Sequence, residues 1–160
     1  MIPSAHFREQ QARARAISRR IVEGVDRYRT PDDSFAIVLD IARLTGMLAI
    51  HFAQIDRSLV PRLVQGDDDV RRLALRFRDE FGEFGRLVKL FNTRWGTSAA
   101  ISGDPVAFRV DVHQLIDAVE ERFVREDRDL FRVNDRLASL ADIEFSMPPA
   151  KPPVAIPNAA

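Results

Sequence analysis

The sequence contains no cysteine. Disulfide bridges, thiolate metal sites and cysteine nucleophiles are therefore excluded. Lysine is also scarce, because only Lys89 and Lys151 occur and the other basic side chains are arginines. Any metal ion held by this chain would have to use histidine, carboxylate, tyrosine or main-chain oxygen as ligands.

An excess of charge of one sign is absent, since 24 Lys and Arg are balanced by 24 Asp and Glu. That balance argues against nucleic acid or an anionic membrane surface as a partner. No apolar run approaches the roughly 20 residues that span a bilayer, and the N-terminus has no hydrophobic segment typical of a signal peptide. We therefore expect a cytoplasmic protein with neither nucleic-acid nor membrane partners.

The chain does contain long segments of helical periodicity. Apolar residues recur in steps of three and four, and no useful stretch alternates with period two. The segments with this period cover about 4–28, 34–64, 70–95 and 105–131. With short connections between them, they predict an all-α protein, an up-down-up-down four-helix bundle.

Local signals mark the ends of these helices. Asp32 and Asp33 suit the start of the second helix, and Asp104 followed by Pro105 suits the start of the fourth. Pro61 predicts a kink near the end of the second helix. We expect one bundle domain over 4–145, with a short extra helix at about 134–143, and a disordered Pro-rich tail over 146–160.

Several polar side chains fall on the inward faces of the predicted helices. They are Gln10 or Gln11, His51, Glu80, Arg122 and Glu126. Each would cost several kcal/mol to bury alone, so we expect them to meet one another, water or an ion. A bundle of this kind builds its sites from inward side chains on facing helices.

The second segment reads HFAQIDRSLVPRL and resembles the helix-two signature of bacterial hemerythrin-like (HHE cation-binding) proteins, approximately H-h-x-x-E-D-x-x-L-Y-P-x-L. FRDEFGEFGRLVKLFNTRW resembles the third helix of that family, and AFRVDVHQLIDAVEERFVREDRDLF resembles the fourth. REQQARARAISRRI is similar to the first. The resemblance covers about 9–131 and implies a bundle that holds two non-haem irons and binds or processes oxygen or nitric oxide, or stores iron.

Few of the family's metal-ligand positions carry a ligand residue in this sequence. His51 matches the histidine of helix two, and Glu126 matches the carboxylate of helix four. Ile55 stands where the family has a bridging Glu, Gln11 where it has the first-helix His, and Arg122 where some members have another His. The third helix offers Glu80 but no His.

These departures argue against a di-iron centre. Isoleucine cannot ligate a metal, and arginine remains a cation that repels a divalent ion. We expect Arg122 to replace the metal charge, pairing with Glu126 and Glu80 while Gln11 and His51 complete a buried polar network. The alternative is a residual site in which His51, Glu126 and Glu80 hold a metal ion.

Three hypotheses for function follow. The favoured one is a degenerate hemerythrin-like bundle that needs no cofactor and acts as a binding or regulatory module for an unknown protein or small ligand. The second is a non-haem iron protein, mono- or dinuclear, that binds or senses oxygen or nitric oxide or stores iron. The third is a structural partner, for example a homodimer. No nucleophile–base pair or phosphate-binding glycine loop supports an enzyme.

Overall fold

The structure, a computed structural model, describes residues 2–146 and is all-α, as predicted. No strand occurs among these residues. The helical elements in chain order are α1 (Ser4–Asp26), η1 (Pro31–Asp33), α2 (Ser34–Gln54), η2 (Ile55–Leu59), α3 (Val60–Val64), α4 (Asp68–Phe81), α5 (Phe84–Trp95), α6 (Ser98–Gly103), α7 (Pro105–Arg125), η3 (Glu126–Phe131) and α8 (Arg132–Ser146). The 3₁₀ turn η1 and the π-helical segments η2 and η3 join longer α-helices into continuous stretches.

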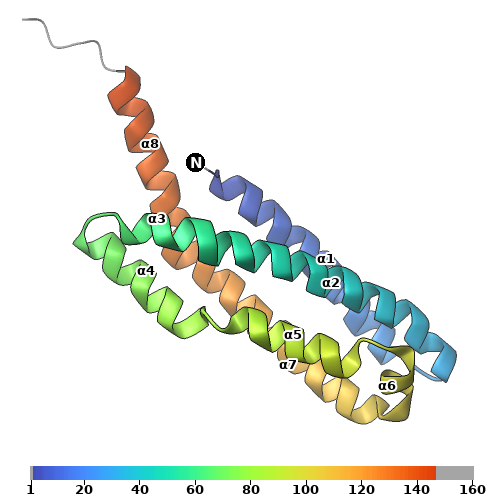
Figure 1. Ribbon diagram of the computed structural model, residues 1–160. Coiled ribbons are helices and arrows are strands. Elements are labelled where there is room, and N and C mark those ends of the chain that lie inside the picture. Colours follow the sequence, from blue (N-terminus) through green and yellow to red (C-terminus); the bar gives the residue numbers. More distant parts are fainter. Residues whose placement is uncertain (1, 147–160) are drawn as a thin grey trace, which may run out of the picture.

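The reversal between α1 and α2 is set by a capping box. The Asp33 carboxylate accepts hydrogen bonds from the backbone N–H groups of Thr30 at 2.9 Å and Arg29 at 2.7 Å. These bonds satisfy donors that a helix N-terminus would leave open, so the chain turns sharply and α2 returns alongside α1 (Figure 1). Ile21 and Val25 of α1 and Ile37 and Ile41 of α2 are buried in one apolar cluster.

The second predicted helix continues from Ser34 to Val64, but it is not a uniform α-helix. The π-helical segment η2 lies directly before Val60 and Pro61. Proline lacks the N–H of a helical bond and crowds the preceding turn, and the wider π turn accommodates it where we expected a kink.

The stretch 31–64 has a mean hydropathy of 1.6 over its most apolar window, enough by length and composition for a membrane span. A core helix of a soluble protein passes the same test.

The third predicted helix is divided in two. α4 ends at Phe81 and α5 begins at Phe84, with Glu83 at φ −95° and ψ 5° outside helical geometry. Gly82 permits this break, because a Cβ atom there would lie 2.7 Å from the main-chain oxygen of Arg78. The phenylalanines at helical spacing in the predicted segment 70–95, Phe77, Phe81, Phe84 and Phe91, are therefore carried by two helices.

The fourth predicted helix begins at Pro105 as expected, with the Asp104 side chain accepting from the N–H of Ala107 at 3.0 Å. It continues without interruption through α7, η3 and α8, so the extra helix expected at 134–143 is part of it. Figure 1 shows α8 extending beyond the rest of the fold. Except for its first residue, the predicted tail lies outside the described residues.

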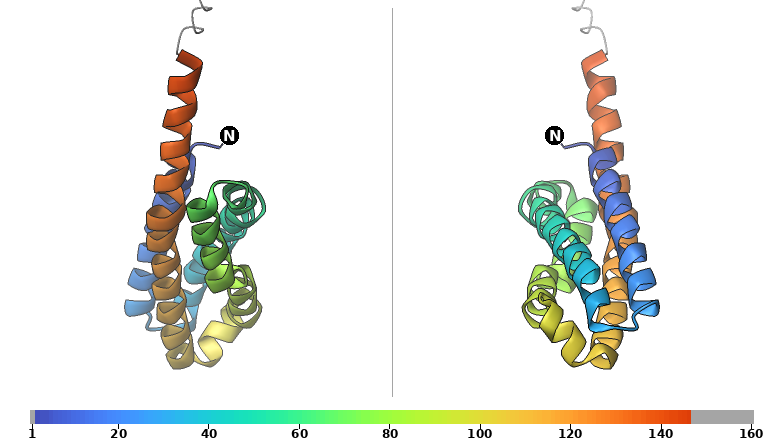
Figure 2. Two further views of the ribbon diagram at one scale, coloured as in Figure 1. Left: turned by 90° about the vertical axis from the view of Figure 1, so that its left-hand side faces the viewer. Right: turned by 90° about the vertical axis from the view of Figure 1, so that its right-hand side faces the viewer.

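The long helices run roughly along one direction in all three views (Figures 1 and 2). α2 packs against α1 and α5, and α7 packs against both of these helices in turn. The buried apolar residues form two clusters, one including Leu48, Phe52 and Phe123 and the other including Phe7 and Leu130. Gln11, His51, Arg122 and Glu126 are buried along their helices where one cluster gives way to the other.

Candidate functional site

Glu126 is the centre of a buried polar cluster. Its Oε2 accepts hydrogen bonds from Nε2 of His51 at 2.7 Å and from Nε2 of Gln11 at 2.9 Å. Its Oε1 accepts from Nε of Arg122 at 2.8 Å. The Glu126 and Arg122 side chains are fully buried, and those of His51 and Gln11 are nearly so. Three helices, α1, α2 and α7, thus converge with donors around one carboxylate, which matches an ionised group.

Arg122 uses each of its guanidinium nitrogens. Besides Glu126, it donates from Nη2 to Oδ1 of Asp56 at 2.7 Å and from Nη1 to the main-chain oxygen of Phe81 at 2.8 Å. The guanidinium carbon also lies 4.0 Å from the ring centroid of Phe52. A buried arginine held by two carboxylates, a carbonyl and an aromatic face is fixed in one orientation.

The local backbone supplies these partners. Phe81 is the last residue of α4, so its carbonyl has no partner within that helix and is free to accept from Arg122. Asp56 lies inside η2, and Glu126 is the first residue of η3. Both π-helical segments thus begin at the polar cluster, and single π turns of this kind are frequent at functional sites.

His51 connects the cluster to a second layer of amides. Its Nδ1 lies 2.8 Å from Oε1 of Gln10, and the Gln10 Nε2 in turn donates to Oε1 of Gln54 at 2.9 Å. Both ring nitrogens of His51 thus have a polar partner, Glu126 on one side and Gln10 on the other.

The two carboxylates respond to burial in opposite ways. Burial alone would raise the pKa of Glu126, but the hydrogen bonds and charges of His51 and Arg122 outweigh it and hold that pKa below its usual value. For Asp56, burial is the largest effect and raises the pKa, despite the neighbouring Arg122 guanidinium. Glu126 is therefore the carboxylate that the surroundings stabilise as an anion.

The structure brings together Gln11, His51, Arg122 and Glu126, but it does not bring Glu80 to them. The Glu80 side chain is 39% exposed and forms an ion pair with Nη1 of Arg125 at 2.7 Å. The end of α4 one residue later places the Phe81 carbonyl, rather than the Glu80 carboxylate, beside Arg122. Glu80 is thus a surface residue of a neighbouring ion-pair group that also contains Asp129.

Two members of the cluster were not assigned to it from the sequence. Asp56 was not among the inward polar residues predicted from the sequence, and Gln10 was only an alternative to Gln11. Asp56 follows Phe52 by four residues, and Phe52 lies on the inward stripe, so this spacing could have identified it. Gln10 lies just beside the inward face, and only its long side chain reaches His51.

The side chains of the cluster do not fit a di-iron centre. Among residues 2–146 there is no group of three or more His, Asp or Glu side chains placed to hold a metal ion. His51 and Glu126 are hydrogen-bonded to each other, and the second oxygen of Glu126 faces the Arg122 guanidinium. A divalent ion there would meet a fixed cation and a single imidazole, and Ile55 is fully buried without a donor atom.

Comparison with known proteins assigns no family to this cluster. No protein-family model, curated protein or solved structure matches the chain. The hemerythrin-like resemblance of the sequence therefore stays a prediction.

Proposed function

We propose that this protein is a hemerythrin-like, up-down-up-down four-helix bundle in which an arginine-centred charge cluster has replaced the metal site. In support, His51 and Glu126, which match ligand positions of the family, lie 2.7 Å apart. Gln11, at the position of the first-helix ligand, reaches the same carboxylate. Four helical segments, with α4 and α5 together as the third, would form the bundle.

The burial of Arg122 carries this proposal. Its guanidinium lies between the carboxylates of Glu126 and Asp56 with no exposed surface, and so supplies the positive charge that a metal would otherwise supply. The cluster offers no nucleophile beside a base and no open coordination position. We therefore propose a cytoplasmic binding or regulatory module rather than an enzyme, with a structural core at the former metal position.

Metal content tests the proposal. The protein is expressed with iron supplied and purified without chelator, and iron, manganese and zinc per chain are measured together with the visible absorption spectrum. The proposal expects substoichiometric metal, no oxo-bridged charge-transfer bands and an unchanged melting temperature when Fe(II) is added. Two irons per chain would overturn it and favour an oxygen- or nitric-oxide-binding iron protein. One iron that is lost in His51→Ala would favour a mononuclear site.

A further inference from the structure

The outer face of α2 is apolar, although it faces away from the core. Along this face, outward positions follow one another in steps of four and three, as in a heptad seam. They are Phe35, Leu39, Ala42, Gly46, Ala49 and Ala53. Phe35 is 61% exposed and Leu39 is 59% exposed, and Ile50 beside them is 59% exposed. A helix that is apolar on both its faces normally has a partner on each.

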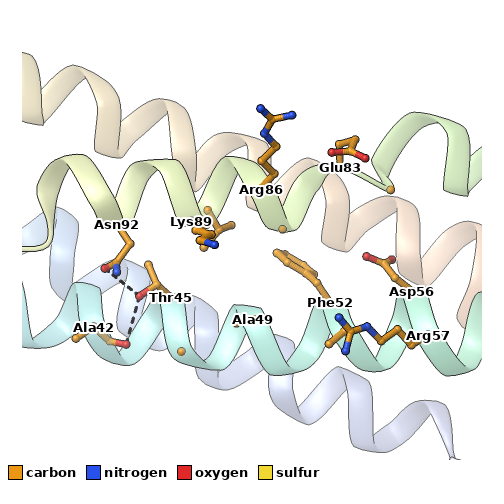
Figure 3. Close-up of a pocket in the computed structure, with 15 residues that line it drawn as sticks. Ala42, Thr45, Ala49, Phe52, Asp56, Arg57, Glu83, Arg86, Lys89 and Asn92 are labelled. Atoms are coloured by element: carbon orange, nitrogen blue, oxygen red, sulfur yellow. Dashed lines mark hydrogen bonds between the residues drawn. The ribbon is translucent and has the colours of Figure 1, made fainter.

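Part of this face, from Ala42 to Ala53, forms one wall of a groove between α2 and α5, whereas Phe35 and Leu39 do not line the groove. The groove has a volume of about 700 Å³, and Phe52 and Val88 lie among its lining residues (Figure 3). A Cβ atom on Gly46 would meet nothing within 4 Å, so no contact within the described residues requires glycine there. Glycine inside a helix costs about 1 kcal/mol relative to alanine, and its use here keeps the groove open.

The border of the groove is positively charged. Arg57, Arg86 and Lys89 line it, are exposed and form no ion pair among residues 2–146. Of the carboxylates that line it, Asp56 is already bound to Arg122, which leaves Glu83. In Figure 3, Glu83 and Arg86 lie on the α5 side of the groove and Arg57 lies on the α2 side. An occupant with negative charge beside an apolar face would complement this surface.

We propose that the groove between α2 and α5 binds an acidic amphipathic helix of a partner protein. The stripe lines the groove over 42–53, about 17 Å at 1.5 Å per residue, and continues along α2 to Phe35, so the whole apolar face is about 27 Å long, the length of a helix rather than of a small ligand. Alanine and glycine in the groove let a helix backbone approach closely, and larger side chains of the partner would fill the space above them. This proposal deepens the role of binding module proposed above and rests on it.

Two other occupants fit the charges and the shape less well. A second copy that packs its own α2 antiparallel across Ile50 would place Arg43 of one chain opposite Arg57 of the other, twice, which is repulsive. A bilayer surface favours a convex face rich in Trp, Phe and Leu. Here the central positions of the stripe are Ala42, Gly46 and Ala49, which line a concave groove.

The test uses the full chain and a designed peptide of about three heptads, with Leu at positions a and d and Glu at e and g. A twin peptide carries Lys in place of every Glu. Isothermal titration calorimetry at about 50 mM salt should show micromolar binding of the acidic peptide and at least tenfold weaker binding of the basic twin. Backbone amide NMR shifts caused by the acidic peptide should concentrate on the exposed residues of 35–57 and 82–92.

A matched pair of variants locates the contact. Ala49→Glu places bulk and negative charge in the groove and should weaken binding of the acidic peptide at least tenfold. Ala12→Glu makes the same change on the exposed face of α1, away from the groove, and should leave binding unchanged. Circular dichroism verifies that both variants keep the wild-type helix content.

Other results would overturn the proposal. These are equal affinity for both peptides, shifts that lie elsewhere, a stable dimer that Ala49→Glu separates, or binding to phosphatidylglycerol vesicles that the same change abolishes. Metal analysis of the same sample separates this proposal from the one before it. Absence of peptide binding in a metal-free protein rejects only the groove, whereas a di-iron centre rejects the proposed function.

Discussion

Nε of Arg122 donates to Oε1 of Glu126 at 2.8 Å across one turn, where α7 passes into η3, and neither side chain has exposed surface. An exposed pair at this spacing contributes about 0.3–0.5 kcal/mol. In the interior, the cost of desolvating both charges can equal or exceed their attraction, so the pair need not raise the net stability. Removing one partner is different, because it leaves the other charge buried without compensation.

Arg122→Met should therefore lower the free energy of unfolding by about 3–5 kcal/mol. Glu126→Gln should also destabilise, because it leaves the Arg122 guanidinium with Asp56 as its only carboxylate partner. The double variant should be less destabilised than the sum of the two single changes, since both charges are removed together. Urea denaturation followed by circular dichroism measures this coupling. If each single change lowered the free energy of unfolding by less than about 1 kcal/mol and the two changes were additive, the pair would not be buried in solution.

Acid should destabilise the protein partly through Glu126. Its pKa in the folded state lies below the unfolded value of about 4.3, so folding is favoured by the ionised form. That contribution is present above the unfolded pKa and is lost as the pH falls through the folded pKa. The stability difference between wild type and Glu126→Gln should thus shrink on acidification from neutral pH. Urea midpoints at several pH values measure it, and a constant difference would contradict the assignment.

Asp56 should behave in the opposite sense. Burial raises its pKa, so the ionised form is disfavoured in the folded state and stability decreases as the pH rises from the unfolded to the folded pKa. Asp56→Asn removes the free-energy cost of burying an ionised carboxylate, but it also removes the negative charge that faces Nη2 of Arg122. We expect a change in stability within about 1 kcal/mol at neutral pH, much smaller than that of Glu126→Gln. A loss as large as that of Glu126→Gln would show that Asp56 is an essential counter-ion.

Two glycines of the same region should respond oppositely to alanine. Gly82→Ala would place a Cβ 2.7 Å from the Arg78 oxygen, so the break after α4 must shift and the Phe81 carbonyl must move from Arg122. At Gly85 a Cβ would meet nothing within 4 Å. We expect Gly82→Ala to lower the melting temperature. Gly85→Ala should raise it, because alanine in a helix is favoured over glycine by about 0.5–1 kcal/mol. Thermal denaturation of both variants under one condition compares them, and equal shifts would contradict the geometry.

Periodicity predicted the buried polar positions because a helix repeats every 3.6 residues regardless of its partners. Gln11, His51, Arg122 and Glu126 occupy the same steps of three and four as their apolar neighbours. The all-α class follows from the same pattern. The hydrogen bonds among these residues depend on the distances between helices, and the periodicity of one helix does not predict those distances.

Periodicity is less informative where the helices depart from regular geometry. The stripe from Phe77 to Phe91 continues past Gly82 with helical spacing, so the break between α4 and α5 was hidden and Glu80 was placed inward. The π-helical segments η2 and η3 change the phase of their helices by hydrogen-bond register alone. Asp56 lies in the first of them, four residues after the buried Phe52, and was not among the predicted inward residues.

We propose that the Arg122 guanidinium stands in place of a metal ion. This proposal is tested most directly by a crystal structure of protein incubated with Fe(II) in the absence of oxygen, with diffraction data collected on both sides of the iron absorption edge. We expect no anomalous peak near Glu126, with Arg122 still bonded to Glu126, Asp56 and the Phe81 carbonyl. An anomalous peak between His51 and Glu126, with the Arg122 side chain turned out of the cluster, would contradict the claim.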